Sequence, residues 1–163
     1  MRLIIVRHAR AKDRDAKSWP DDTQRPLTKG GSRDFARLAA RMPNWIEPPA
    51  AVLASGWVRA WDTAAILCNE TGWPDPIRCR ALETEGGAPA VQAILQELRA
   101  RADQASVAIV GHEPVLGELI GHLLGGDALV AVAKGAVAVL DMHPGEGRGT
   151  LLALVPPEAV QRP

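Results

Sequence analysis

Short apolar runs alternate along the chain with longer segments that have a helical pattern. The short runs cover residues 3–6, 50–54, 77–79 and 107–110. The runs at 3–6, 50–54 and 107–110 are continuously apolar and predict buried strands, whereas 77–79 contains Arg78 and predicts only a further short strand. Between and after them, residues from about 28 to 42, 57 to 70, 89 to 101 and 114 to 124 predict helices. The alternation is typical of an α/β fold with a parallel sheet.

The end of the chain has a different pattern. Residues 136–142 and 150–155 are two strand-like runs on either side of Pro144-Gly145, which predicts a β-hairpin. The whole pattern therefore predicts an α/β three-layer sandwich, with a mostly parallel central sheet, helices on both faces and a C-terminal β-hairpin. No internal repeat is present, and we expect residues 1–163 to form a single domain.

Local signals place several element boundaries. Thr28 is a suitable N-cap for the first helix, Gly72 fits the position after the second helix, and Pro114 fits the first position of the fourth. Residues 13–27 are polar and contain two prolines. A connection of this length inside a compact domain is usually functional or mobile.

Charge and cysteine content exclude several classes of function. The 19 basic residues balance the 19 acidic residues, so no global field attracts nucleic acid or a membrane surface. Cys68 and Cys79 form no Cys-x-x-Cys pair and are expected to be reduced thiols. The apolar start is too short for a signal peptide, and no apolar run reaches membrane-spanning length. We expect a cytoplasmic protein.

Cationic and imidazole side chains follow three of the apolar runs. Arg7 and His8 end the first run, Ser55 ends the second and precedes Arg59, and His112 follows the last. Because parallel strands present their carboxyl ends at one edge of the sheet, these residues are expected to meet there. Helix N-termini add backbone donors at the same edge. Two guanidinium groups and two imidazoles predict a pocket for a phosphate-like dianion.

The motifs resemble those of the histidine phosphatase superfamily, also called phosphoglycerate mutase-like, and most of all its SixA-type phosphohistidine phosphatase branch. The resemblance covers residues 3 to 155 and rests on Arg7-His8-Ala9, Arg25-Pro26-Leu27-Thr28, Ser55-x-x-x-Arg59-Ala60-x-x-Thr63 and Gly111-His112. It implies a phosphoglycerate mutase-like fold and a metal-independent phosphatase that needs no cofactor. A zinc site of the His-Glu-x-x-His type is excluded separately, because Leu116 stands where the second histidine would be.

The resemblance also implies a role for each residue. His8 would be the nucleophile that forms a covalent phosphohistidine, and nearby arginines would lower its pKa and keep it neutral. Arg7, Arg59 and His112 would bind the phosphoryl oxygens, and Arg25 would reach the same anion from the long loop.

Two departures from the family pattern bear on the substrate. Ala9 and Gly56 replace the common glycine and proline of the superfamily, which changes the turns more than the chemistry. Glu83 and Glu85 lie where many relatives have a catalytic glutamate, but neither matches cleanly. A proton donor is essential for an alkoxide leaving group and matters less for an imidazole, so its absence favours phosphohistidine.

We therefore expect a phosphohistidine phosphatase that acts on a phosphorylated protein, such as a histidine phosphotransfer domain, and that is a monomer. Two alternatives remain open. One is a phosphomonoesterase of the same superfamily acting on a small phosphate ester, and the other is a catalytically silent phospho-binding module. Retention of His8 argues against the silent module, because a pure binder needs no nucleophile.

Overall fold

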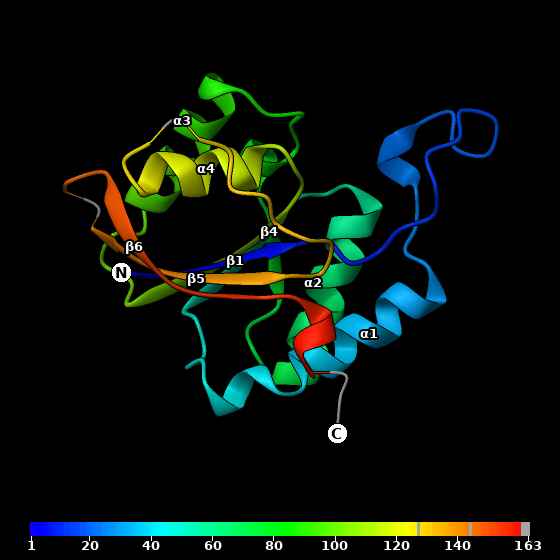
Figure 1. Cartoon of the computed structure of the whole chain (residues 1–163), viewed down its shortest axis with the longest axis horizontal. Coiled ribbons are helices and arrows are strands. Elements are labelled where there is room, and N and C mark those ends of the chain that lie inside the picture. The colour runs from blue at the N-terminus through cyan, green and yellow to red at the C-terminus, as the bar shows by residue number, and fades with distance from the viewer. Residues whose placement is uncertain (127, 144, 161–163) are drawn as a thin grey trace.

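The computed structural model describes residues 1–126, 128–143 and 145–160 (Figure 1). Its centre is a six-stranded sheet in the order β3-β2-β4-β1-β5-β6. The strands are β1 (Arg2–Arg7), β2 (Ala51–Ala54), β3 (Pro76–Arg78), β4 (Ser106–Gly111), β5 (Val137–His143) and β6 (Arg148–Val155). The first four are parallel to one another, whereas β5 is antiparallel to both β1 and β6.

Helices cover both faces of the sheet, as Figure 1 shows. They are α1 (Lys29–Ala39), α2 (Val58–Thr71), α3 (Ala88–Arg99) and α4 (Val115–Leu123). Side chains alternate along β1: Leu3 and Ile5 join the core under α3 and α4, while Ile4 and Val6 join the core under α1 and α2. A strand buried on both faces must be continuously apolar. The predicted three-layer α/β sandwich with a C-terminal hairpin is confirmed, although Pro144 of the predicted turn lies outside the described residues.

Two of the predicted helix boundaries are confirmed in detail. The Thr28 hydroxyl accepts a hydrogen bond from the backbone N–H of Gly31 at 2.9 Å and caps α1. Gly72 has a φ of 71° and ends α2 in the left-handed conformation. By contrast, α1 ends at Ala39 and not at Met42, because Pro43 cannot continue an α-helix and the chain forms a short 3₁₀ turn over Met42–Asn44. Pro114 precedes α4 as its N-cap.

The register of the sheet brings the predicted site residues together. Arg7 pairs with Gly111 at the carboxyl end of β1 and β4, and Ala54 pairs with Val110 at the end of β2. The residues that follow these ends, His8, Ser55 and His112, therefore lie at the same edge of the sheet. No helix among the described residues is long and apolar enough to cross a membrane.

Candidate active site

His8 lies directly after β1 and is held by its own chain. Its backbone N–H donates to the carbonyl of Gly111 at 3.0 Å, which extends the β1–β4 ladder by one residue. The ring atom Nδ1 lies 2.7 Å from the carbonyl oxygen of Ala9. Because a carbonyl oxygen only accepts hydrogen bonds, Nδ1 carries the proton and Nε2 carries a lone pair. The lone pair at Nε2 is the chemical requirement for a histidine nucleophile.

Burial keeps His8 neutral. The residue is 5% exposed, and this desolvation lowers the pKa of His8 to about 3, against the opposing effect of the Ala9 hydrogen bond. The charges of Arg59, Arg7 and Arg25 lower the pKa further but less strongly. The sequence correctly predicts a lowered pKa, but it attributes the shift to the arginines, whereas burial is the larger cause.

His112 follows β4 and faces His8, with 5.3 Å between the ring centroids. Its Nε2 lies 2.8 Å from the hydroxyl of Ser55, which also accepts the backbone N–H of Trp57 at 3.2 Å. Ser55 is fully buried, so its hydroxyl proton needs an acceptor, and His112 Nε2 is the acceptor it contacts. His112 is therefore protonated at Nδ1, and burial lowers its pKa to about 2.

Three buried N–H groups at this edge lack a hydrogen-bond partner within the described part of the chain. They are Arg7 Nε, Arg59 Nε and His112 Nδ1. The charges of both arginines lower the pKa of both histidines, which places all four groups in one cluster. Buried donors without acceptors are costly unless a ligand supplies the acceptor. Three donors, two of them charged, fit the oxygens of a phosphoryl group.

Arg59 is fixed by contacts from two sides. It is 3% exposed. Its Nη1 donates to the carbonyl of Asp22 at 2.7 Å, and its Nη2 forms an ion pair with the Asp22 carboxylate at 3.2 Å. Its guanidinium carbon lies 5.0 Å from the centre of the Trp57 ring. Trp57 in turn packs against His112 at 4.4 Å between ring centroids. Trp57 therefore contacts two residues of the cluster, Arg59 and His112.

Thr63 connects the helix that carries Arg59 to the chain after His8. Its hydroxyl donates to the Arg59 carbonyl at 2.6 Å and accepts the backbone N–H of Ala9 at 3.0 Å. Thr63 is fully buried, and both partners satisfy its hydroxyl. Arg59 and Thr63 are one helical turn apart and therefore lie on the same face of α2, which lets Thr63 contact both partners.

Arg25 is near the cluster, but its donors are engaged elsewhere. Its Nε binds the Asp22 carboxylate at 2.8 Å, and its Nη1 donates to the carbonyl of Lys12 at 2.7 Å. The hydrogen bond from Arg25 is the largest cause of the lowered pKa of Asp22. Arg25 thus affects the site in two ways: its charge lowers the pKa of the histidines, and it binds Asp22, which also binds Arg59. Asp22 lies in the long polar loop, where no local sequence pattern distinguishes it from its neighbours.

The two glutamates predicted as proton donors are placed unfavourably for that role. Both Glu83 oxygens bind Arg78, at 2.6 and 2.9 Å, and Oε1 also accepts the backbone N–H of Gly56 at 3.1 Å. Arg78 lowers the pKa of Glu83, whereas a proton donor at neutral pH needs a raised pKa. Glu83 therefore holds the turn after Ser55, and its ion pair with Arg78 does not favour the predicted role as a proton donor. Glu85 is exposed.

Glu113 holds the segment that passes from α4 to β5. Its carboxylate accepts the backbone N–H groups of Val132 at 2.9 Å and Gly117 at 3.0 Å. Arg7 donates from Nη1 to the carbonyl of Val132 at 2.6 Å. The Val132 residue is thus bound on one side by Glu113 and on the other by Arg7, which fixes the Arg7 side chain beside His8.

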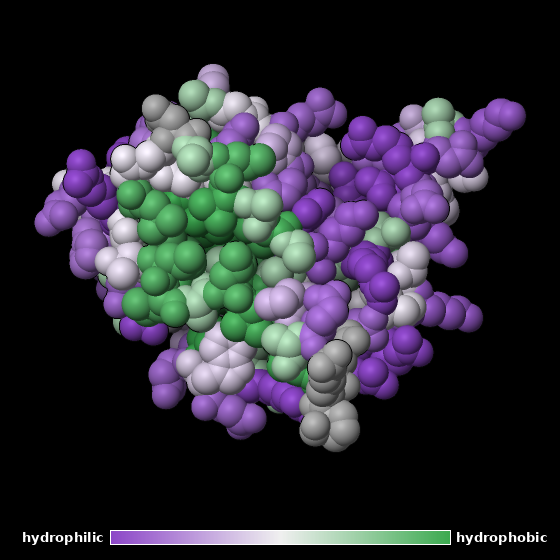
Figure 2. Space-filling view, in the orientation of Figure 1, coloured by the Kyte–Doolittle hydropathy of each residue, from purple (hydrophilic) through white to green (hydrophobic). Residues whose placement is uncertain are grey.

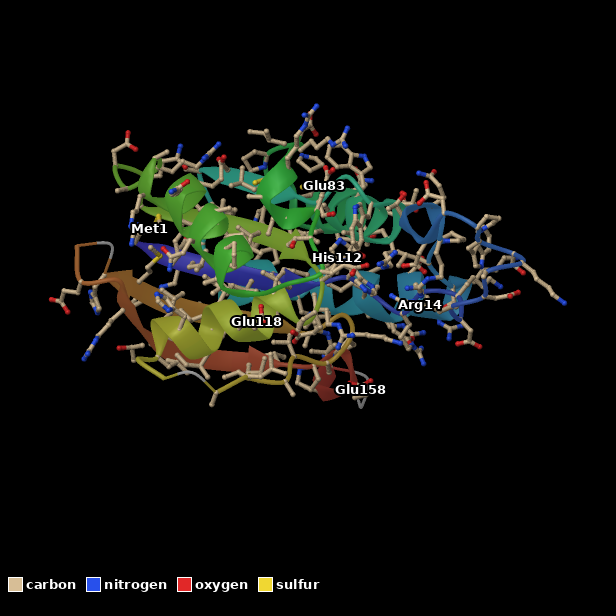
Figure 3. All side chains as sticks on the ribbon, turned by 90° about the horizontal axis from the view of Figure 1, so that it is seen from above. Met1, Arg14, Glu83, His112, Glu118 and Glu158 are labelled. Atoms are coloured by element: carbon tan, nitrogen blue, oxygen red, sulfur yellow. The ribbon has the colours of Figure 1, made fainter. Side chains whose placement is uncertain are left out.

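Figure 3 shows where two of these residues lie in the molecule. Glu83 and His112 lie at the same end of the sheet, far from Met1, and Arg14 on the long loop has its Nε 3.6 Å from the Asp22 carboxylate. Among the residues that the structure describes, no group of three or more histidine, cysteine, aspartate or glutamate side chains could hold a metal ion. Cys68 and Cys79 are buried and unbonded to each other.

Known proteins share both the sequence and the fold. The family model of the histidine phosphatase superfamily (branch 1) matches residues 3–87. An uncharacterized protein from Picosynechococcus is 34% identical over 118 residues, which cover 72% of this chain and 70% of that protein.

Solved structures extend the likeness over nearly the whole chain. The protein histidine phosphatase SixA, complexed with tungstate, superposes with a TM-score of 0.82 at 26% identity and covers 99% of this chain and 100% of its own. The alpha-ribazole phosphatase from Shigella flexneri has a TM-score of 0.77 at 20% identity, over 96% and 97% of the two chains. At that identity the second likeness concerns the fold alone. The chain therefore belongs to the histidine phosphatase superfamily, branch 1, and is a phosphatase of that superfamily.

Proposed function

We propose that the protein removes the phosphoryl group from phosphohistidine on another protein, through a covalent phosphohistidine on His8. The observation that carries the proposal is the state of the His8 ring. Its Nδ1 proton is bound by the Ala9 carbonyl and its pKa is far below neutral, so Nε2 offers a lone pair beside three buried donors without partners. A neutral imidazole next to an anion site is suited to nucleophilic attack on phosphorus.

The reaction then has two displacements. The substrate reacts with its ring protonated on the nitrogen that does not carry phosphorus. His8 Nε2 forms a bond to phosphorus while the P–N bond of the substrate breaks, and the substrate imidazole leaves as a neutral ring that keeps this proton. Water next attacks the phosphoryl group on His8, the Nε2–P bond breaks, and inorganic phosphate is released with the protons of that water. Arg7, Arg59 and the Nδ1–H of His112 bind the oxygens throughout and stabilise the charge in each transition state.

Among the described residues, the two carboxylates bonded to the cluster or its turns are poor proton donors, and this supports a P–N substrate over a phosphate ester. An alkoxide leaving group requires a proton from the enzyme, whereas an imidazole leaving group does not. These carboxylates belong to Asp22 and Glu83. The hydrogen bond from an arginine, Arg25 or Arg78, is the largest cause that lowers the pKa of each. The likeness to SixA, at 26% identity over the full chain, supports the same choice.

A comparison of substrates tests the proposal. We expect kcat/KM to be at least about 100-fold higher for a phosphohistidine phosphotransfer domain than for 3-phosphoglycerate or a hexose phosphate. His8→Ala is the control, and it should lose turnover of both classes. If a small ester equals or exceeds the protein substrate, the phosphohistidine assignment is wrong, and the protein is a small-molecule phosphatase of the same superfamily.

A further inference from the structure

Asp22 places a carboxylate beside a cluster of groups that is suited to an anion. Its Oδ2 lies 3.2 Å from Arg59 Nη2, and Arg59 Nε is one of the buried donors without a partner in the described part of the chain. By charge alone, Asp22 weakens the binding of a dianion at Arg59. If Asp22 serves the reaction, a second effect must outweigh this repulsion.

The second effect is the orientation of the Arg59 side chain, because Asp22 engages both of its terminal nitrogens. The backbone carbonyl of Asp22 accepts a hydrogen bond from Nη1 at 2.7 Å, and its carboxylate forms the ion pair with Nη2. A guanidinium group is rigid and planar, so fixing two of its three nitrogens also fixes the direction of the third. Asp22 thus determines where the Nε–H of Arg59 points.

The Asp22 carboxylate is itself held in place by a second arginine. Arg25 Nε donates to Oδ1 at 2.8 Å, and Arg25 Nη1 donates to the carbonyl of Lys12 at 2.7 Å. Arg14 Nε lies 3.6 Å from the same Oδ1. The hydrogen bond from Arg25 is the largest cause that lowers the pKa of Asp22, so the carboxylate remains an ionised acceptor at neutral pH.

The loop that carries Asp22 is positioned by polar contacts. No residue from 12 to 24 is buried, and the side of the molecule where this loop lies in Figure 1 is covered by hydrophilic residues in Figure 2. Hydrophobic packing therefore does not place this part of the loop. The turn at Asp22 is ordered locally by Asp21, whose carboxylate accepts the backbone N–H of Thr23 at 3.0 Å and its hydroxyl at 2.6 Å.

We propose that Asp22 is a positioning residue of the phosphatase, which holds Arg59 so that its Nε–H faces the phosphoryl group. The gain from this orientation outweighs the repulsion between the Asp22 carboxylate and the anion. The long polar loop then contributes to the reaction through Arg59. This role rests on the proposed binding of the phosphoryl oxygens by Arg59, and it is the same whichever phosphorylated compound is the substrate.

The affinity for tungstate, the oxyanion in the solved SixA complex, separates the two effects by their sign. If charge alone mattered, Asp22→Asn would tighten tungstate binding. We expect Asp22→Asn instead to weaken binding by about 5-fold to 10-fold in isothermal titration calorimetry, and to lower kcat/KM by about 10-fold or more.

Asp21→Asn is the matched control for this comparison. It removes the same charge from the preceding residue, which forms no ion pair within the described ranges of the chain. Its tungstate affinity should remain within about 2-fold of the wild type. Circular dichroism checks that each variant is folded.

A double-mutant cycle tests whether Asp22 acts through Arg59. Arg59→Met should by itself weaken tungstate binding by about 10-fold to 100-fold, and Asp22→Asn should cause no further loss in that background. A role limited to the stability of the loop would give the same loss in both backgrounds.

Two results would overturn the proposed role of Asp22. One is tungstate binding by Asp22→Asn that equals or exceeds that of the wild type, and the other is an undiminished loss in the Arg59→Met background. Unchanged binding by Arg59→Met would contradict the anion site itself, and the role of Asp22 with it. The comparison of substrates described above tests the phosphohistidine assignment separately.

Discussion

Lowering the pH from about 7 to about 5 should destabilise the protein through its two buried histidines. His8 and His112 are neutral in the folded state because burial lowers their pKa values to about 3 and about 2. In the unfolded chain both return to an ordinary pKa of about 6.5. Below that value the unfolded state binds more protons than the native state, so the contribution to stability is complete above pH 6.5 and is lost as the pH decreases.

The size of this loss of stability follows from the protonation of the histidines in the unfolded and folded states. At pH 5 the protonation of each histidine in the unfolded chain lowers the free energy of unfolding by about 2 kcal/mol relative to pH 7. The loss for both residues is therefore about 4 kcal/mol. Because both native pKa values lie well below 5, this loss depends on the unfolded pKa and hardly on the depth of the native shift. It is a large fraction of the 5–15 kcal/mol that is typical of a domain.

Urea denaturation at the two pH values, in buffers without phosphate, measures this loss. The chain has four histidines, and the other two, His122 and His143, are exposed, which provides a matched control. The double variant His8→Ala/His112→Ala should lose less than about 1 kcal/mol between the two pH values, whereas His122→Ala/His143→Ala should lose as much as the wild type. Equal losses in both double variants would refute the assignment to the buried pair.

Two further predictions concern the anion-binding groups. Ser55→Ala removes the hydroxyl that fixes the tautomer of His112, and it should lower kcat by about 10-fold to 100-fold. The control Ser106→Ala, at another buried serine, should leave kcat unchanged. If the two variants have equal kcat values, the tautomer assignment is contradicted. Activity should also survive exhaustive treatment with EDTA, because the guanidinium groups and His112 supply the positive charge that a metal would otherwise provide. Loss of activity that magnesium or zinc restores would contradict that expectation.

The strands and the edge where the site lies were predictable because their signals are local. A short apolar run is recognisable in the sequence, and parallel strands place their carboxyl ends together whatever connects them. The positions of Arg7, His8, Arg59 and His112 in one cluster follow from those two facts. The cap at Thr28 and the end of α2 at Gly72 are likewise set by one or two residues.

The partners of these residues were not predictable, because they depend on the path of irregular chain. Asp22 reaches Arg59 across 37 positions, and Glu113 reaches the Val132 backbone across 19. Neither loop has a periodic pattern that would reveal its course. Glu83 illustrates the same limit in reverse: its place in the sequence suggested a proton donor, but the contact with Arg78 gives it the opposite ionisation behaviour.

The proposed transfer of a phosphoryl group to His8 Nε2 is tested most directly by trapping the intermediate. The enzyme is mixed with a ³²P-labelled phosphohistidine protein, quenched rapidly in base and digested, and the labelled peptide is sequenced. We expect acid-labile, base-stable label on His8, bonded at Nε2, and none on the His8→Ala variant, which should also lose turnover. Label on another residue, label at Nδ1, or turnover by His8→Ala at the wild-type rate would contradict the assignment of His8 Nε2 as the nucleophile.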